Sequence, residues 1–209
     1  MKSRIWIVLF SIIAVVGVSE PSQAIVFSWA FLRQSGEHTE VIDFSKRASI
    51  KNGDGLRIRL DVKQVAYVYL FLFDSSRVLQ RFYPESLNDY KGVGPGRVSL
   101  PSPYGWFAVD DNSGIERFTL IVSANPLEEL EIAAVHFERN RDDLDSQAVV
   151  LEELRRVIQQ HSDLAAPTET GVPIAAAVQT RDIGDEIEGL ATLVEADGFY
   201  SKTLRILHE

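Results

Sequence analysis

One stretch of the chain constrains its fold more than any other: residues 66–73, which read Ala-Tyr-Val-Tyr-Leu-Phe-Leu-Phe. These eight consecutive apolar or aromatic residues are too few to span a bilayer as a helix. Their aromatic side chains and the β-branched valine favour a strand, in which alternate side chains point to opposite faces. Both faces would then be apolar and both would need cover. We therefore expect residues 66–73 to form a central strand of a packed sheet.

The neighbouring segments also have a β pattern. In residues 56–63, Leu, Ile, Leu and Val alternate with Arg57, Arg59, Asp61 and Lys63, which predicts a half-buried strand with its charged row in solvent. We expect further short strands at 78–83, 97–100, 106–109 and 116–123, separated by Gly, Pro, Asn and Asp turns. Residues 25–32 fit either a first strand or a hydrophobic N-terminal arm. This spacing is typical of an antiparallel β-sandwich or a partly open barrel.

The pattern becomes helical towards the C-terminus. Residues 146–161 place Val150, Leu154, Val157 and Ile158 on one face, with Asp145 or Ser146 as the N-cap and a Glu152–Arg156 pair on the surface.

Three other C-terminal segments complete the expectation. Residues 127–137 fit either a helix or a helix followed by a strand, with Asn125 as N-cap and Pro126 in the first turn. Residues 165–173 are expected to be a loop or linker, and residues 198–207 a last strand. The predicted fold is mainly β, with one or two peripheral helices.

The N-terminus has the pattern of a secretory signal. A basic start precedes an apolar run from Ile5 to Val18, and Ser22-Gln23-Ala24 supplies small residues for cleavage. We expect residues 1–24 to be a signal peptide and residues 25–209 to be a single β-rich domain with its core at about 45–127. An uncleaved N-terminal anchor is the alternative. The expected product is periplasmic or secreted, with no stable membrane span after cleavage.

Composition narrows the functional classes. The chain has no cysteine, so disulfides, thiolate metal sites and a lipoprotein anchor are excluded. Its net charge is −9, and Lys and Arg are not clustered along the sequence. Nucleic acids and anionic lipid surfaces are therefore not expected as partners, since both require a basic surface.

The order of motifs resembles a bacterial family, domain of unknown function 4384. The matching pieces are Gly53 to Leu60, Ala66 to Leu70, Phe82-Tyr83-Pro84, Leu100-Pro101 and Gly114 to Ser123, which together cover about residues 50–127. This resemblance implies a small β domain of the kind found beside kinase-like or caspase-like domains or in exported proteins. It implies no catalytic residues. The family usually has a glycine in the hairpin after the central strand, where this chain has Ser75-Ser76.

No catalytic or cofactor motif is present in the sequence. The four histidines (His38, His136, His161 and His208) have no metal-ligand spacing, and neither G-x-S-x-G nor a phosphate loop occurs. Gly92 to Gly96 predicts a loop, since it lacks the Lys-Ser/Thr of a phosphate site. Asp142, Asp143 and Asp145 are expected to be a solvated approach to a helix, with weak calcium binding as the alternative. We expect no catalytic residue, no cofactor and no metal.

Two features remain as candidates. Glu116 precedes a strong strand, and we expect it to be a buried structural acid bonded to loop N–H groups rather than a catalytic one. Tyr83, Tyr90, Tyr104 and Trp106 lie in loops or at strand ends and could form a partner-binding surface, or could cover the open end of the sandwich. Tyr104 and Trp106 follow two prolines that stiffen their loop.

These observations predict a non-enzymatic binding or assembly module of the cell envelope, whose partner is another envelope protein. The alternatives are an envelope hydrolase with a site assembled from distant residues, or an accessory subunit of an envelope complex.

Overall fold

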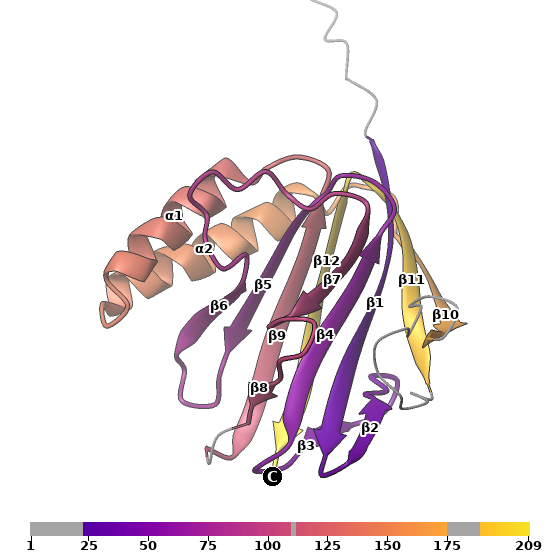
Figure 1. Ribbon diagram of the computed structural model, residues 1–209. Coiled ribbons are helices and arrows are strands. Elements are labelled where there is room, and N and C mark those ends of the chain that lie inside the picture. The colour runs from indigo at the N-terminus through magenta and orange to yellow at the C-terminus, as the bar shows by residue number, and fades with distance from the viewer. Residues whose placement is uncertain (1–22, 110–111, 175–188) are drawn as a thin grey trace, which may run out of the picture.

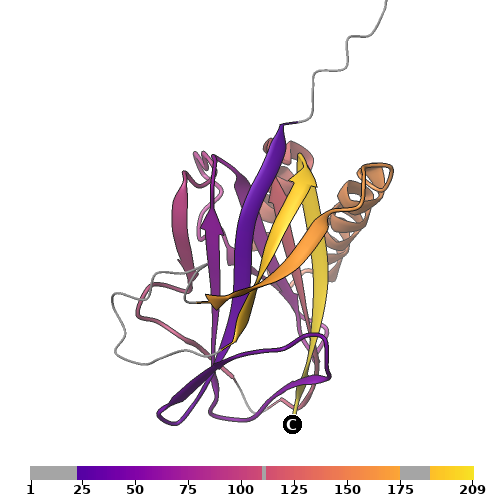
Figure 2. The same ribbon diagram turned by 90° about the vertical axis from the view of Figure 1, so that its right-hand side faces the viewer.

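The computed structural model describes residues 23–109, 112–174 and 189–209. Two β-sheets pack face to face, and two helices cover the outer face of the second sheet (Figures 1 and 2). The signal peptide predicted for residues 1–24 lies almost wholly outside the described residues. No helix in the described part of the chain is long and apolar enough to cross a membrane.

The first sheet, sheet A, has seven strands and follows the order β10-β11-β1-β4-β7, with β2 beside β1 and β8 beside β4. Its strands are β1 (Ala24–Ser35), β2 (His38–Val41), β4 (Gly55–Val62), β7 (Gly96–Leu100), β8 (Phe107–Ala108), β10 (Thr168–Pro173) and β11 (Leu190–Asp197). All its pairings are antiparallel.

The second sheet, sheet B, has five strands in the order β3-β12-β9-β5-β6. Its strands are β3 (Ala48–Ile50), β5 (Tyr67–Phe73), β6 (Leu79–Tyr83), β9 (Gly114–Ser123) and β12 (Phe199–His208). Only the short β3–β12 pairing is parallel. The two sheets form a sandwich-like pair, which confirms the prediction of a mainly β fold, an antiparallel β-sandwich or partly open barrel with one or two helices.

Strand β5 is the central strand that the sequence predicts. It lies between β9 and β6, and its side chains alternate between two buried layers. Val68, Leu70 and Leu72 enter the core between the sheets, whereas Tyr69 and Phe71 enter the core beneath the helices. An apolar strand is thus covered on both faces because a second sheet lies on one side and a helical layer on the other.

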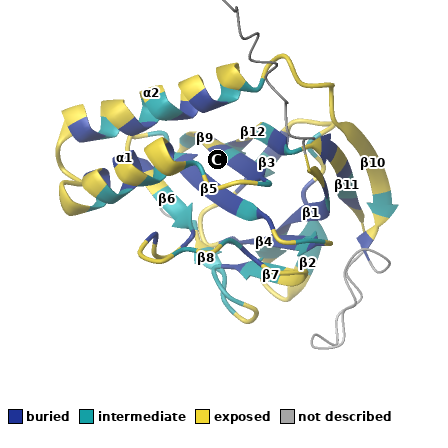
Figure 3. Ribbon diagram, turned by 90° about the horizontal axis from the view of Figure 1, so that it is seen from above, coloured by how far each residue is buried: buried dark blue, intermediate teal, exposed yellow. Residues whose placement is uncertain are grey.

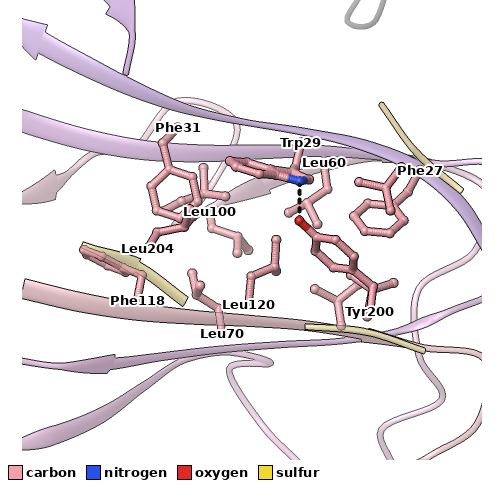
Figure 4. Close-up of a cluster of buried hydrophobic side chains, with 14 of the residues drawn as sticks. Phe27, Trp29, Phe31, Leu60, Leu70, Leu100, Phe118, Leu120, Tyr200 and Leu204 are labelled. Atoms are coloured by element: carbon pink, nitrogen blue, oxygen red, sulfur yellow. Dashed lines mark hydrogen bonds between the residues drawn. The ribbon is translucent and has the colours of Figure 1, made fainter. Parts of the chain in front are cut away.

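The core between the sheets is built from the alternating residues of both (Figure 4). Strand β1 supplies Phe27, Trp29 and Phe31, which face Phe118 and Tyr200 from sheet B. Phe31 meets Phe118 edge to face at a ring separation of 5.5 Å, and Phe27 meets Tyr200 in the same way at 5.2 Å. Such edge-to-face pairs add to the hydrophobic stabilisation that burial provides.

Helices α1 (Glu128–Arg139) and α2 (Leu144–Gln160) form the third layer. The predicted apolar face of the second helix is confirmed, since Val150, Leu154 and Val157 are buried against sheet B and α1. Figure 3 shows that the opposite face of both helices is exposed. The segment at 127–137, which the sequence left open, is helical.

The predicted helix caps are wrong in detail. Asp143, rather than Asp145 or Ser146, caps α2 and accepts hydrogen bonds from the backbone N–H groups of both those residues. The N-cap position of α1 is Leu127, without a side-chain cap, so Asn125 does not cap it. The surface ion pairs of α2 are Glu152–Arg155 and Glu153–Arg156, at i,i+3 instead of the expected i,i+4 spacing.

The C-terminal segments contain two strands, β10 and β11, that the sequence did not predict. Residues 168–173, expected to be a loop, form edge strand β10, which is largely exposed (Figure 3). It pairs along its whole length with β11. Pro173 ends it, as proline is tolerated at a sheet edge. The last strand is confirmed as β12, which pairs with β9 over ten residues.

The prediction of a solvated charged row on β4 is wrong for its first two members. Arg57 is 2% exposed and Arg59 is 5% exposed, while Asp61 is half-buried and only Lys63 is exposed. The loop at 101–106 folds over Arg57, whose Nε donates to the carbonyl of Gly105 at 2.8 Å. The predicted alternation of inward and outward side chains on β4 is correct, but the loop covers the outer face of the strand at Arg57.

Candidate functional site

A pocket opens at the end of the sandwich near the C-terminus, the lower end in Figure 1. Its volume is about 170 Å³. One wall is apolar, and the other is formed by polar side chains from the β5–β6 turn, the start of β9 and the end of β12. The lining residues are Ile50, Leu56, Leu72, Asp74, Ser75, Gln80, Phe82, Phe107, Ala108, Val109, Asn112, Glu116, Phe118 and His208. A cavity of about 150 Å³ holds one benzene ring, so this pocket fits a single side chain or a small ligand.

Glu116 is the buried acid of this pocket. It is 6% exposed, and its Oε1 accepts a long hydrogen bond of 3.4 Å from the backbone N–H of Ser75. Its Oε2 is buried and has no hydrogen-bond partner in the part of the chain that the structure describes. The bond to a turn N–H is the kind expected of a structural acid, but that role leaves half of the carboxylate unused. Buried polar atoms without partners are rare and call for an explanation.

The electrostatics around Glu116 favour a positive ligand. Burial raises the pKa of this carboxyl above its usual value, and the negative charge of Asp74 adds to the rise. The hydrogen bonds from Ser75 and the nearby His208 act in the opposite direction. A cation placed beside Oε2 would stabilise the ionised form and lower this pKa.

The position of Glu116 depends on a close approach between two segments. Gly114 opens β9 with φ of +153°, and a Cβ added there would lie 2.4 Å from the Cβ of Ser75. Only glycine allows the β5–β6 turn to come this near. The hydroxyl of Ser75 donates to the carbonyl of Asn112 at 3.2 Å, which holds the turn in place. The glycine therefore brings the Ser75 N–H within reach of Glu116.

The other ionisable residues in the pocket have structural contacts. Asp74 accepts a 2.8 Å hydrogen bond from the backbone N–H of Val78 and so stabilises the turn. His208 is 2% exposed and its Nε2 lies 2.6 Å from Oδ1 of Asn52. Sequence reasoning singled out Glu116 but neither of these two. Asp74 reads as an ordinary turn residue, and His208 comes near only through the pairing of β12 with β9.

The remaining histidines lie elsewhere. His38 is in β2, His136 in α1 contacts the Ser146 hydroxyl at 3.2 Å, and His161 stacks on Phe199 at 3.9 Å. In the part of the chain that the structure describes, no three His, Asp or Glu side chains are grouped to hold a metal ion.

The four predicted partner-binding aromatics fall into two separate pairs. Tyr83 and Tyr90 contact each other edge to face at 6.1 Å, and both are half-buried. The Tyr90 hydroxyl donates to the carbonyl of Val68 at 3.1 Å and accepts from its N–H at 3.0 Å. Tyr90 thus satisfies the backbone of β5 in the region before β6 pairs with it.

The second pair lies in the loop at 101–106. Tyr104 is 77% exposed, whereas Trp106 is half-buried and packs over the guanidinium of Arg57 at 3.9 Å. Among the described residues, no ring contact joins these two side chains to Tyr83 or Tyr90. The structure therefore separates the predicted surface into a tyrosine cluster beside β5 and an exposed loop on sheet A.

Residues 49–126 match the family described as Domain of unknown function (DUF4384). This confirms the resemblance, and the matched segment contains the central strand, the β5–β6 turn and Glu116. No curated protein matches the chain. No solved structure matches it either.

Proposed function

We propose that this chain, which carries a DUF4384 domain at residues 49–126, is an exported binding module of the cell envelope. We propose further that the pocket beside Glu116 receives one basic side chain of a partner protein. The observation that carries the proposal is the Oε2 of Glu116, a residue that lines the partly apolar pocket: this atom is buried and has no hydrogen-bond partner within residues 23–109, 112–174 and 189–209.

Three properties of the pocket support a basic side chain. Its volume suits one side chain, and its apolar wall, which includes Leu56, Leu72 and Phe107, suits an aliphatic stem. Lys and Arg bury such stems while their charged ends seek a polar partner. Glu116, together with Asp74, supplies negative potential at the polar end. An ion pair formed there replaces the missing hydrogen bond of Oε2.

The test is a titration of the purified protein with N-acetyl-lysine methylamide, followed by NMR shifts of the pocket residues. The uncharged norleucine analogue has the same stem and serves as the matched ligand control. We expect the lysine probe to shift the Glu116 and Ser75 signals and the norleucine probe to do so far less. Glu116→Gln should abolish that difference, while Glu128→Gln, an exposed acid on α1, should keep it. Equal shifts with both probes would refute a basic ligand.

A second candidate function is hydrolysis, and one observation favours it. His208, Asp74 and Glu116 line the same pocket, which is the combination expected of acid–base catalysis. Against it, the Ser75 hydroxyl donates a hydrogen bond to the backbone carbonyl of Asn112. The test is turnover of p-nitrophenyl acetate by the wild-type protein and by Glu116→Gln and Ser75→Ala. Turnover that both substitutions abolish would favour the hydrolase.

The export itself is tested by N-terminal sequencing of the protein from the envelope fraction. Cleavage of residues 1–24 gives a product that starts at Ile25, whereas a product that retains the leader would support an anchor. Recovery of a partner from that fraction, lost on Glu116→Gln and retained on Glu128→Gln, would identify the protein that binds.

A further inference from the structure

Two arginines are buried on the outer face of sheet A and have no counter-ion among the described residues. Arg57 and Arg59 lie two residues apart on β4 and point away from the sandwich core, because Leu56, Ile58 and Leu60 fill it. Across residues 23–109, 112–174 and 189–209, neither arginine forms an ion pair. Buried charges are normally paired, since desolvation of an unpaired ion costs several kcal/mol.

Specific donors of both side chains lack acceptors. Nη1 of Arg57 and Nε of Arg59 are buried, and neither atom has a hydrogen-bond partner among the residues that the structure describes. The acid on the same face of β4, Asp61, pairs instead with Lys63 at 3.0 Å. Burial lowers the pKa of Arg59, and the positive charges of Arg57 and Arg97 lower it further. Arg97 belongs to β7, whose register with β4 places it opposite Asp61 and next to the Arg59–Ser99 pair.

The loop at 101–106 fixes the orientation of one guanidinium. The carbonyl of Gly105 accepts the Arg57 Nε–H, and the indole of Trp106 covers the plane of the guanidinium. Gly55 allows this packing, because a Cβ there would lie 3.1 Å from the Cβ of Trp106. Arg57 is therefore held in place with its Nη1 unused, which is the preorganised form of an anion-binding arginine.

We propose that Arg57 and Arg59 form a site for a small oxyanion, a carboxylate or a phosphate, on the outer face of β4. The planar guanidinium matches both groups through paired N–H···O bonds. Arg97 adds positive charge at the edge of the site. The exposed Tyr104 precedes Gly105 in the loop that covers Arg57. This site is separate from the Glu116 pocket and has the opposite charge preference.

The test measures the melting temperature of the purified protein in increasing phosphate, and separately in acetate, with chloride adjusted to keep ionic strength constant. We expect a saturable rise in the melting temperature of the wild-type protein with at least one of the two anions. The comparison of phosphate with acetate identifies which anion binds. Arg59→Gln should weaken that anion's apparent affinity by about tenfold or more. It should also melt higher than wild type without anion, because the variant no longer buries an unpaired charge. Arg117→Gln, which removes an exposed arginine on sheet B, should behave like wild type.

A second measurement covers the case in which a variant folds poorly. In wild type alone, the NMR signals of the Trp106 indole N–H and the arginine Nε–H groups should shift with the same concentration dependence as the melting temperature. If neither the melting temperature nor these NMR signals change with phosphate or acetate, the proposed anion site is refuted. The chain itself must then neutralise the two arginines.

Discussion

The indole N–H of Trp29 donates a hydrogen bond of 3.2 Å to the hydroxyl of Tyr200, joining the two sheets through their core (Figure 4). The Tyr200 hydroxyl in turn donates to Glu169 of β10 at 3.1 Å, and Lys202 pairs with the same carboxylate at 2.8 Å. A strand of each sheet and the edge strand β10 are thus linked by one polar chain. Burial raises the pKa of Tyr200, and the charge of Glu169 raises it further, so the hydroxyl remains protonated.

Tyr200→Phe should lower the free energy of unfolding by about 1–3 kcal/mol, because it leaves the buried Trp29 N–H without an acceptor. Chemical denaturation measures the change. Tyr104→Phe removes the same hydroxyl from an exposed side chain and should change stability by less than about 0.5 kcal/mol. Equal effects of the two substitutions would show that the Trp29–Tyr200 bond contributes nothing.

Tyr69→Phe should loosen the start of α1. The Tyr69 hydroxyl accepts a hydrogen bond of 3.1 Å from the backbone N–H of Leu127 and donates to the carboxylate of Glu131. The Tyr69 hydroxyl therefore satisfies the backbone N–H of Leu127, the N-cap residue of α1, which has no side-chain cap. We expect a loss of about 1–3 kcal/mol and faster hydrogen exchange in the first turn of α1. Tyr67→Phe, on the same strand, is the control, and similar exchange in both variants would contradict this role.

Asp143→Ala should destabilise the protein, because its carboxylate accepts hydrogen bonds from two backbone N–H groups at the start of α2. A hydrogen bond from the Ser146 hydroxyl lowers the pKa of Asp143 most, and the two backbone hydrogen bonds lower it further. Asn125→Ala should have little effect, since Asn125 caps no helix. Thermal unfolding of both variants measures the difference. A larger loss of stability for Asn125→Ala than for Asp143→Ala would support Asn125 as the helix cap that the sequence predicts.

Glu116→Gln should change how stability depends on pH. The folded state raises the pKa of Glu116 above 4.5, so it holds the proton more tightly than the unfolded state does. The contribution of this carboxyl to stability therefore falls as pH rises from 4.5 through the folded pKa. The variant, which cannot ionise, should gain stability relative to wild type over that interval. Parallel pH profiles of the two proteins would show that Glu116 is not desolvated.

Arg77→Gly should stabilise the β5–β6 turn. Arg77 is the residue of this turn with a left-handed φ, +67°, a conformation that glycine adopts without strain. Its carbonyl still accepts from Gln147 after substitution. We expect a gain of about 0.5–1 kcal/mol, net of the entropy that glycine loses. Ser76→Gly, where φ is not positive, should be neutral or destabilising. A gain in stability for Ser76→Gly but not for Arg77→Gly would show that Arg77 is not the strained residue.

Elements with a local side-chain pattern could be predicted from the amino-acid sequence. Residues 66–73 are apolar on both faces and form a strand that is buried on both faces. The period of Val150, Leu154 and Val157 predicts the helix that packs on it. The alternation in residues 56–62 gives the correct inward face for β4. Each of these follows from side-chain direction along a single element, which requires no knowledge of its neighbours.

The tertiary structure alone decided what lies against each face. Arg57 and Arg59 carry the pattern of a solvated row, but a loop more than forty residues later in the chain folds over Arg57. Strand β10 has a weak β pattern and exists because β11 pairs with it along its length. The pocket assembles Asp74, Glu116 and His208 from three parts of the chain. A period of two specifies the direction in which a side chain points, whereas its cover and its partners depend on pairings between distant segments, and those pairings determine both proposed sites.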